Sequence, residues 1–144
     1  HGRVNKLGVP SFVFSREEFI AGVPILEKLA EYDVCLIVLA GFMNKISDVI
    51  LQAFPGKIVN IHPALLPKYG GKGMYGMHVH EAVVKAGERE SGITIHYINE
   101  HYDEGAIIFQ ASCPVLPSDT PDEVAAKVHA LEYAHYPHVI ESLL

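Results

Sequence analysis

The segment KIVNIHPALLPKYGG, Lys57 to Gly71, joins an apolar strand pattern to polar side chains that a core does not need. Asn60 and His62 lie two residues apart, so on an extended chain they project to the same side. Pro63 fixes its own φ and biases His62 toward an extended conformation. The segment therefore predicts a strand whose carboxyl end presents an amide and an imidazole together.

The residues before this segment predict helices and a further strand. Ser15, with two glutamates in the following turn, is typical of a helix N-cap, and Pro24 should kink that helix or split it in two. DVCLIVLAGF, residues 33–42, is a continuous apolar run and predicts a strand buried on both faces in a parallel sheet. A short strand ending at Val13 and a helix over residues 47–54 complete this part.

The residues after it continue the alternation. Residues 63–77 are predicted as loop and residues 79–85 as a helix. GITIHYIN (92–99) and GAIIFQASCPV (105–115) are predicted as strands joined in a hairpin. A final helix should begin at Pro121 and run to about Tyr136, with Pro137 starting or kinking a terminal turn. This order predicts an α/β domain with a mixed sheet, formed by residues 1–144 as one unit.

The amino-acid composition argues against several classes of function. The chain has 144 residues, 49% apolar and 19% charged, with a net charge of -6 and no block of like charges. This argues against non-specific nucleic-acid binding. No apolar run is long enough to span a bilayer, and no signal peptide is present, so neither a membrane nor a secreted location is expected. Cys35 and Cys113 are expected to be buried thiols in a reducing cytosol, which predicts a cytoplasmic protein.

The polar residues at the strand end suggest acyl-group chemistry. Ligands of open α/β sheets bind beyond the carboxyl ends of parallel strands, where Asn60, His62 and residues 41–45 are predicted to lie. An amide and an imidazole on one side can stabilise an oxyanion that develops on a carbonyl. Asp103, in a polar turn between two strands, is the candidate to orient His62 and favour its charged form. The alternative is that Asn60 and Asp103 only form turns and that His62 is an ordinary partly buried histidine.

Four motifs occur in a familiar order: LAGFM, NIHPALLPKY, HYDEGAIIFQ and ALEYAHYP. Over essentially the whole chain they resemble the phosphoribosylglycinamide formyltransferases. That resemblance implies a Rossmann-like formyltransferase fold, with a mixed, mostly parallel sheet flanked by helices. It implies transfer of a formyl group from 10-formyltetrahydrofolate, the co-substrate, to the amine of 5'-phosphoribosylglycinamide in de novo purine biosynthesis.

The resemblance also assigns residues by position. Asn60, His62 and Asp103 match the family's catalytic Asn, His and Asp, and no metal is needed. The remaining residues fall in two groups. Those matching the folate-binding segments are Leu39, Phe42, Met43, Asn44, Lys45, Ile46, Ile98, Asn99, Glu100, His101 and Tyr102. Those matching the substrate-binding set are Pro63, His129 and Glu132. Family members usually carry an arginine where Asn44 and Lys45 stand here, which bears on how the folate tail is held.

The family begins with a strand, a phosphate-binding loop, a helix and a second strand, and these residues contain no equivalent. We therefore expect residues 1–144 to be the carboxyl-terminal part of the family domain, not competent alone, and monomeric or homodimeric. Alternatives remain open: a formyltetrahydrofolate hydrolase of the same fold, a non-catalytic folate-binding remnant, or a metal hydrolase using His78 and His80. Methionyl-tRNA formyltransferase is disfavoured by the acidic composition.

Overall fold

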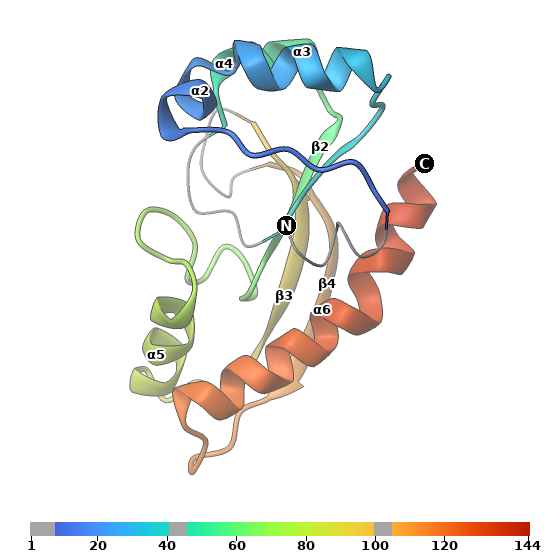
Figure 1. Ribbon diagram of the computed structural model, residues 1–144. Helices are drawn as coiled ribbons and strands as arrows, with labels where there is room; N and C mark the ends of the chain where they lie inside the picture. Colours follow the sequence, from blue (N-terminus) through green and yellow to red (C-terminus); the bar gives the residue numbers. More distant parts are fainter. Residues whose placement is uncertain (1–7, 41–45, 100–104) are drawn as a thin grey trace.

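The computed structural model describes residues 8–40, 46–99 and 105–144, and Figure 1 shows their arrangement. The elements, in chain order, are α2 (Arg16–Ala21), α3 (Val23–Glu31), β1 (Ile37–Leu39), α4 (Asp48–Ala53), β2 (Ile58–His62), α5 (Met77–Lys85), β3 (Glu90–Tyr97), β4 (Ile107–Pro114) and α6 (Pro121–Leu143). The alternation predicted from the sequence is confirmed, with most boundaries within a few residues. The α2, α3 and α4 helices lie together at one end of the sheet, and α6 crosses its length.

The four strands form one sheet in the order β1-β2-β3-β4. β1 runs parallel to β2, whereas β2–β3 and β3–β4 are antiparallel. The predicted mixed sheet is confirmed, and among the described strands its parallel part is the β1–β2 pair. The register places Asn60 beside Leu39 on β1 and beside His96 on β3, so the predicted oxyanion donor sits in the middle of the sheet.

The two faces of β2 and β3 differ in character. Ile61, Ile93 and Ile95 belong to the main apolar cluster together with residues of α6, which packs on β3 and β4. The alternate positions carry Asn60 and His62, whose register partners are likewise polar and buried. Since residues i and i+2 of a strand share a face, the sequence separates an apolar face, on which α6 packs, from a face of buried polar side chains.

The α6 helix is longer than the sequence predicts. Thr120 forms a capping box with Glu123 at its start, and the helix continues through Pro137 to Leu143. The predicted helix end near Tyr136 is therefore wrong, and Pro137 does not start a separate terminal turn. A proline removes one intrahelical hydrogen bond, but Val139 and Ile140 beyond it pack against the main apolar cluster, and that burial keeps the last turns helical.

The first predicted helix is two helices. Gly22, with φ of 78°, ends α2 and begins α3, and Pro24 lies in the first turn of α3, where a proline is tolerated. Splitting, the second of the two outcomes foreseen for Pro24, is confirmed. A Cβ at position 22 would overlap the Ser47 hydroxyl, so glycine is needed here for space as well as for conformation.

The amino-terminal strands differ from expectation. The strand predicted to end at Val13 is wrong: residues 9–15 form no strand, and Val13 is 77% exposed. Of the strand predicted over residues 33–42, the described residues 33–40 confirm only β1, and residues 41–42 lie outside the described part. The strand is not buried on both faces, since Val38 is 39% exposed. β1 is an edge strand of the described sheet with one hydrogen-bonded neighbour. Cys35 just before it is exposed and Cys113 is half-buried, so the prediction of two buried thiols is wrong.

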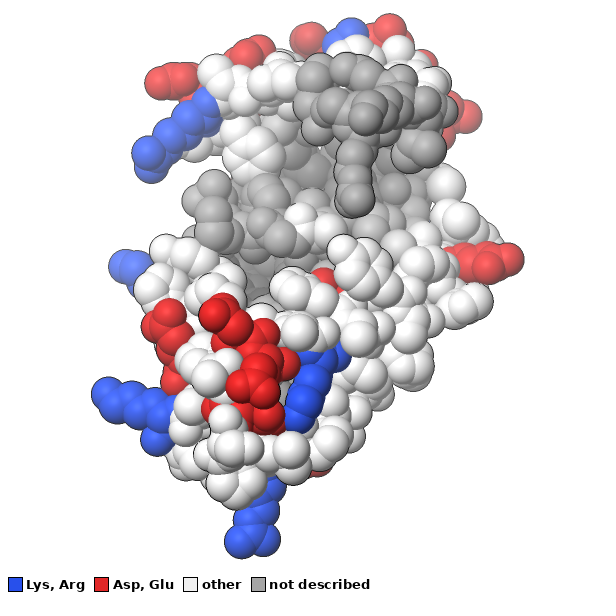
Figure 2. Space-filling model, turned by 60° about the horizontal axis from the view of Figure 1, so that its bottom comes forward, with Lys and Arg blue, Asp and Glu red and all other residues white. Residues whose placement is uncertain are grey.

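The surface carries charges of both signs. Figure 2 shows acidic side chains gathered on the lower part of one face, with lysines and arginines standing singly around it. Asp119 and Lys127 form a close ion pair at 2.5 Å between the loop before α6 and α6 itself. In the part of the chain that the structure describes, no helix is both long and apolar enough to cross a membrane.

Candidate functional site

Asn60 is held in the centre of the sheet by a buried histidine. Its side chain is 7% exposed, and its Nδ2 lies 3.4 Å from Nε2 of His96, which is fully buried. His96 Nδ1 lies 3.1 Å from the carbonyl oxygen of Tyr97. Because a carbonyl can only accept, His96 carries its proton on Nδ1, and its Nε2 accepts one N–H of Asn60. The second N–H of the Asn60 amide is then the predicted donor to an oxyanion.

His62 ends β2 and is also nearly buried, at 4% exposure. Its Nε2 lies 2.6 Å from the backbone carbonyl oxygen of Tyr69 in the following loop. Two residues after Asn60 on the same strand, it shares that residue's face, as the sequence predicts. The pair therefore places an amide donor and an imidazole at one end of β2.

The loop that follows His62 is fixed by a buried polar network. Thr94 on β3 donates its hydroxyl to the carbonyl oxygen of Ala64 at 2.7 Å and accepts the Leu66 N–H at 3.0 Å. Gln110 on β4 donates to Thr94 Oγ1 at 2.9 Å and to the Leu66 carbonyl at 3.0 Å. These bonds satisfy every donor and acceptor of Thr94 Oγ1 and hold the chain after Pro63 against the sheet.

Three residues of the predicted folate set converge from three different elements. Leu39 at the end of β1, Ile46 before α4 and Ile98 after β3 belong to one apolar cluster with Ile58. Ile98 also donates its N–H to the Ile58 carbonyl at 2.9 Å. Asn99 follows directly. Segments from positions 39, 46 and 98 thus surround the strand that carries Asn60.

The other predicted residues of this site lie outside the described part of the chain. They are the catalytic candidate Asp103 and the folate-binding candidates Phe42, Met43, Asn44, Lys45, Glu100, His101 and Tyr102. Described residues close to these two segments share one apolar cluster: Leu39 and Ile46 lie near residues 41–45, and Ile98 lies near residues 100–104.

The predicted substrate-binding residues on α6, His129 and Glu132, lie beside a third histidine. His129 and Glu132 are one helical turn apart, with Nδ1 and Oε2 separated by 3.4 Å. The ring of His80 on α5 lies 6.5 Å from that of His129, edge to face. Burial lowers the pKa of His80, and the charges of His129 and His62 lower it further. His80 therefore stays neutral at pH 7 between the strand-end imidazole and α6.

Tyr136 connects α6 to the first strand. Its hydroxyl donates to the carbonyl oxygen of Leu39 at 2.6 Å. Burial, aided by the negative charge of Glu132, raises the pKa of Tyr136, so this phenol remains a donor. The substrate-binding candidate Glu132 and the folate-binding candidate Leu39 are thereby joined through one side chain.

Sequence reasoning missed three residues of this arrangement. His96 could have been found from the sequence, because it lies two residues after Thr94 and therefore on the same face of a strand whose other face is apolar. His80 appeared only as half of an HxH pair, and its burial comes from the packing of α5 against α6. Tyr69 gave no signal, since it acts on His62 through its backbone carbonyl.

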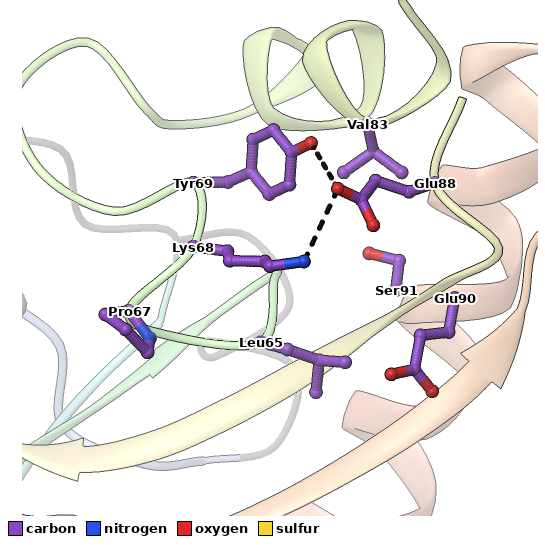
Figure 3. Close-up of a pocket in the computed structure, with 8 residues that line it drawn as sticks. All are labelled: Leu65, Pro67, Lys68, Tyr69, Val83, Glu88, Glu90 and Ser91. Atoms are coloured by element: carbon purple, nitrogen blue, oxygen red, sulfur yellow. Dashed lines mark hydrogen bonds and ion pairs between the residues drawn. The ribbon is translucent and has the colours of Figure 1, made fainter. Parts of the chain in front are cut away.

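A pocket of about 240 Å³ lies between the loop after His62, the carboxyl-terminal part of α5 and the start of β3 (Figure 3). Its walls are Leu65, Pro67, Lys68, Tyr69, Val83, Glu88, Glu90 and Ser91. It does not include Asn60 or His62, so it is distinct from the oxyanion arrangement, and Tyr69 is the residue that both share. Among the described residues, no group of three or more His, Cys, Asp or Glu side chains is arranged to hold a metal ion.

Comparison with known proteins shows which family this chain is similar to. Residues 2–140 match the formyl transferase family. The chain is 41% identical over 141 residues to the chloroplastic phosphoribosylglycinamide formyltransferase of Arabidopsis thaliana, covering 94% of this chain and 48% of that protein. It is 39% identical to the Haemophilus influenzae phosphoribosylglycinamide formyltransferase, covering 96% of this chain and 65% of that protein.

Solved structures agree. Phosphoribosylglycinamide formyltransferase from Streptococcus pneumoniae TIGR4 superposes with a TM-score of 0.89 at 38% identity, covering 99% of this chain and 78% of that one. The chain spans about half the length of the plant relatives that it matches. The family match, the shared fold and the identity along the chain together show that the chain belongs to the formyl transferase family.

Proposed function

We propose that this protein transfers the formyl group of 10-formyltetrahydrofolate to the primary amine of 5'-phosphoribosylglycinamide, a step of de novo purine biosynthesis. The observation that carries the proposal is the buried Asn60 amide, held by His96 at 3.4 Å next to His62, in a chain of the formyl transferase family. The relatives named phosphoribosylglycinamide formyltransferase support this acceptor.

The chemistry is an acyl transfer without a covalent enzyme intermediate. The amine nitrogen attacks the formyl carbon, a C–N bond forms, and the carbonyl oxygen takes the negative charge. Asn60 donates its free N–H to that oxygen, and protonated His62 stabilises the same charge. Collapse of the tetrahedral species breaks the bond to N10, and the proton lost by the amine passes to N10. Asp103 is proposed to relay that proton through water and to keep His62 charged.

The described residues fit a folate on the β1 side of Asn60. Leu39, Ile46 and Ile98 belong to one apolar cluster. In the sequence they adjoin or begin the two segments that are proposed to bind the pterin. We propose that residues 42–46 and 98–102 hold the pterin mainly through backbone N–H and C=O groups. The folate supplies the activated formyl group, and Asn60 supplies the oxyanion contact.

The acceptor is proposed to bind on the α6 side. Glu132 is a carboxylate that can accept from the glycinamide amine, with His129 beside it and Pro63 following the catalytic His62. We further propose that residues 1–144 fold as one domain, that the protein is a monomer or a homodimer, and that it acts in the cytoplasm. The two free cysteines fit a reducing compartment.

The test is a product assay on the full-length protein that contains residues 1–144, called the full chain in the experiments below, supplied with both substrates. The proposal predicts stoichiometric formylated glycinamide ribonucleotide, dependent on both substrates and unaffected by a chelator. Release of free formate in place of the formylated product would instead identify a hydrolase. Folate binding without either product would identify a non-catalytic folate-binding protein.

A further inference from the structure

Tyr69 has a backbone conformation that its side chain does not favour. Its φ is 57°, in the left-handed region, where residues other than glycine, asparagine and aspartate are uncommon. Such a conformation persists only when the surrounding structure holds it, and it marks a position worth a functional hypothesis. A tyrosine in this place therefore needs contacts that offset the strain.

Both ends of Tyr69 supply such contacts. Its carbonyl oxygen lies 2.6 Å from Nε2 of His62. Its hydroxyl donates to Glu88 Oε1 at 3.0 Å, and Lys68 approaches the same oxygen at 3.6 Å. Figure 3 shows the Tyr69 ring and the Lys68 side chain both directed at Glu88.

Glu88 is a fixed anchor. Its backbone N–H donates to the Val83 carbonyl at 3.2 Å at the end of α5, and its side chain is only 26% exposed. Desolvation and the Glu88 carboxylate raise the pKa of Tyr69, so the phenol stays protonated and keeps donating at neutral pH. The contact between Tyr69 and Glu88 therefore ties the loop after His62 to α5.

The carbonyl contact determines where His62 carries its proton. A carbonyl oxygen only accepts, and at 2.6 Å an unprotonated Nε2 would set two lone pairs against each other. Neutral His62 must then carry its proton on Nε2 and its lone pair on Nδ1. From Nδ1 it can donate only as the imidazolium, and when neutral it can only accept there.

We propose that Tyr69 is a positioning residue for His62, with the chain Glu88–Tyr69–His62 acting as a clamp that holds the imidazole in its Nε2–H form. The catalytic consequence of the clamp rests on the proposed function: with Nε2 bound to the Tyr69 carbonyl, Nδ1 is the ring nitrogen of His62 that faces the reacting groups. Tyr69 itself touches no substrate in this scheme.

The experiment uses the ¹⁵N-labelled full chain and four variants. Tyr69→Ile disfavours the left-handed backbone because its side chain is β-branched, whereas Tyr69→Asn tolerates that conformation. Tyr69→Phe removes only the hydroxyl. Tyr32→Phe removes the hydroxyl of an exposed tyrosine at the end of α3 and serves as the matched control.

The first readout is the long-range ¹H–¹⁵N spectrum of His62 at a pH where the ring is neutral. The parent and Tyr32→Phe should show the Nε2–H form alone. Tyr69→Ile should show a mixture of both neutral forms. Tyr69→Asn keeps the backbone conformation but loses the contact with Glu88, so, like Tyr69→Phe, it should show the Nε2–H form with a broadened signal. A neutral Nδ1–H form in the parent, or a His62 spectrum unchanged in Tyr69→Ile, would overturn the clamp.

The second readout is the rate of formyl transfer at saturating substrates. Tyr69→Ile should lower it about tenfold to a hundredfold, the cost of a misplaced catalytic group, with folate affinity little changed and Tyr69→Asn recovering most of the loss. A parent that shows the Nε2–H form but transfers no formyl group refutes the proposed function and leaves the clamp standing. A parent that transfers formyl at a rate equal to that of Tyr69→Ile refutes the clamp alone.

Discussion

The amino-terminal half of the described chain (residues 8–54) and the carboxyl-terminal half (residues 58–144) differ in how much apolar surface they bury. β3 has six consecutive buried residues, whereas neither α2 nor α3 has a buried residue. Val9, Val13 and Ile20 are all more than half exposed in the amino-terminal half. Burial restricts a side chain's position. Among the described residues, Asn60 and His62 therefore lie in the half held by more buried contacts, and Leu39 and Ile46 lie in the half held by fewer.

The largest expected effect compares one isoleucine from each half. Ile95→Ala should lower the free energy of unfolding by about 2–5 kcal/mol, because Ile95 is fully buried in the main cluster. Ile20→Ala should change it by less than about 0.5 kcal/mol, because Ile20 is 66% exposed. Urea unfolding followed by circular dichroism measures both. Equal losses would show that the two halves do not differ as described.

A side-chain hydrogen bond that joins the two halves gives the next largest expected effect. Tyr136→Phe removes the hydrogen bond to the Leu39 carbonyl and should cost about 0.5–1.5 kcal/mol. Amide hydrogen exchange should rise in β1 more than in β3, because the lost bond is the one from α6 to the end of β1. Faster exchange in β3 with β1 unchanged would contradict this role for Tyr136.

Two helix caps of the same type, one in each half, allow a comparison in which a smaller effect on stability is expected. Ser15 and Thr120 each form a capping box, one in each half. Thr120→Ala should cost about 1 kcal/mol of global stability. Ser15→Ala should cost less globally and should instead increase local opening of α2, because the amino-terminal half has few buried contacts to couple that helix to the core. Native-state hydrogen exchange resolves local from global opening, and identical profiles would refute the difference.

The smallest expected effect is a difference in stability that is present at neutral pH and disappears in acid. The hydrogen bond from Lys127 lowers the pKa of Asp119, with a further contribution from the Leu116 N–H. A depressed folded-state pKa means that this stabilisation is present above the unfolded value of about 3.9 and is lost as pH falls through the lower folded value. Asp119→Asn should therefore be less stable than the parent at pH 7, and the gap should narrow below about pH 3.9.

Glu27→Gln, a change at an exposed carboxylate on α3, is the control for that pH series. It should follow the parent at every pH. Thermal unfolding at several pH values measures both variants, and a gap between Asp119→Asn and parent that widens in acid would reverse the assigned sign.

The sequence predicted what depends on local pattern and missed what depends on packing. The apolar runs and the spacing of Asn60 and His62 sufficed for β2 and the polar face of the sheet. A strand ending at Val13 was predicted because β-strand propensity does not depend on whether a neighbouring strand is present to pair with it. Pro137 was expected to start or kink a terminal turn because the cost of a proline is local. The burial of Val139 and Ile140, which offsets that cost, depends on tertiary packing.

The candidate site divides in the same way. Asn60 was found by its chemistry, but its partner His96 lies 36 residues away and meets it only through the β2–β3 register. Tyr69 could not be found, because a backbone carbonyl has no residue-specific signature. Asp103, predicted from the resemblance and its place in a polar turn, lies outside the described residues and stays a prediction.

The most direct test of the account is the single-turnover rate of formyl transfer in Asn60→Ala, measured against the parent full chain. Gln52→Ala, which deletes an exposed amide on α4, is the control and should match the parent. Loss of one oxyanion donor should slow transfer about 10²–10³-fold, with folate affinity little changed. A loss under about tenfold, well below the range for such a donor, would contradict the assignment of Asn60 as the oxyanion donor.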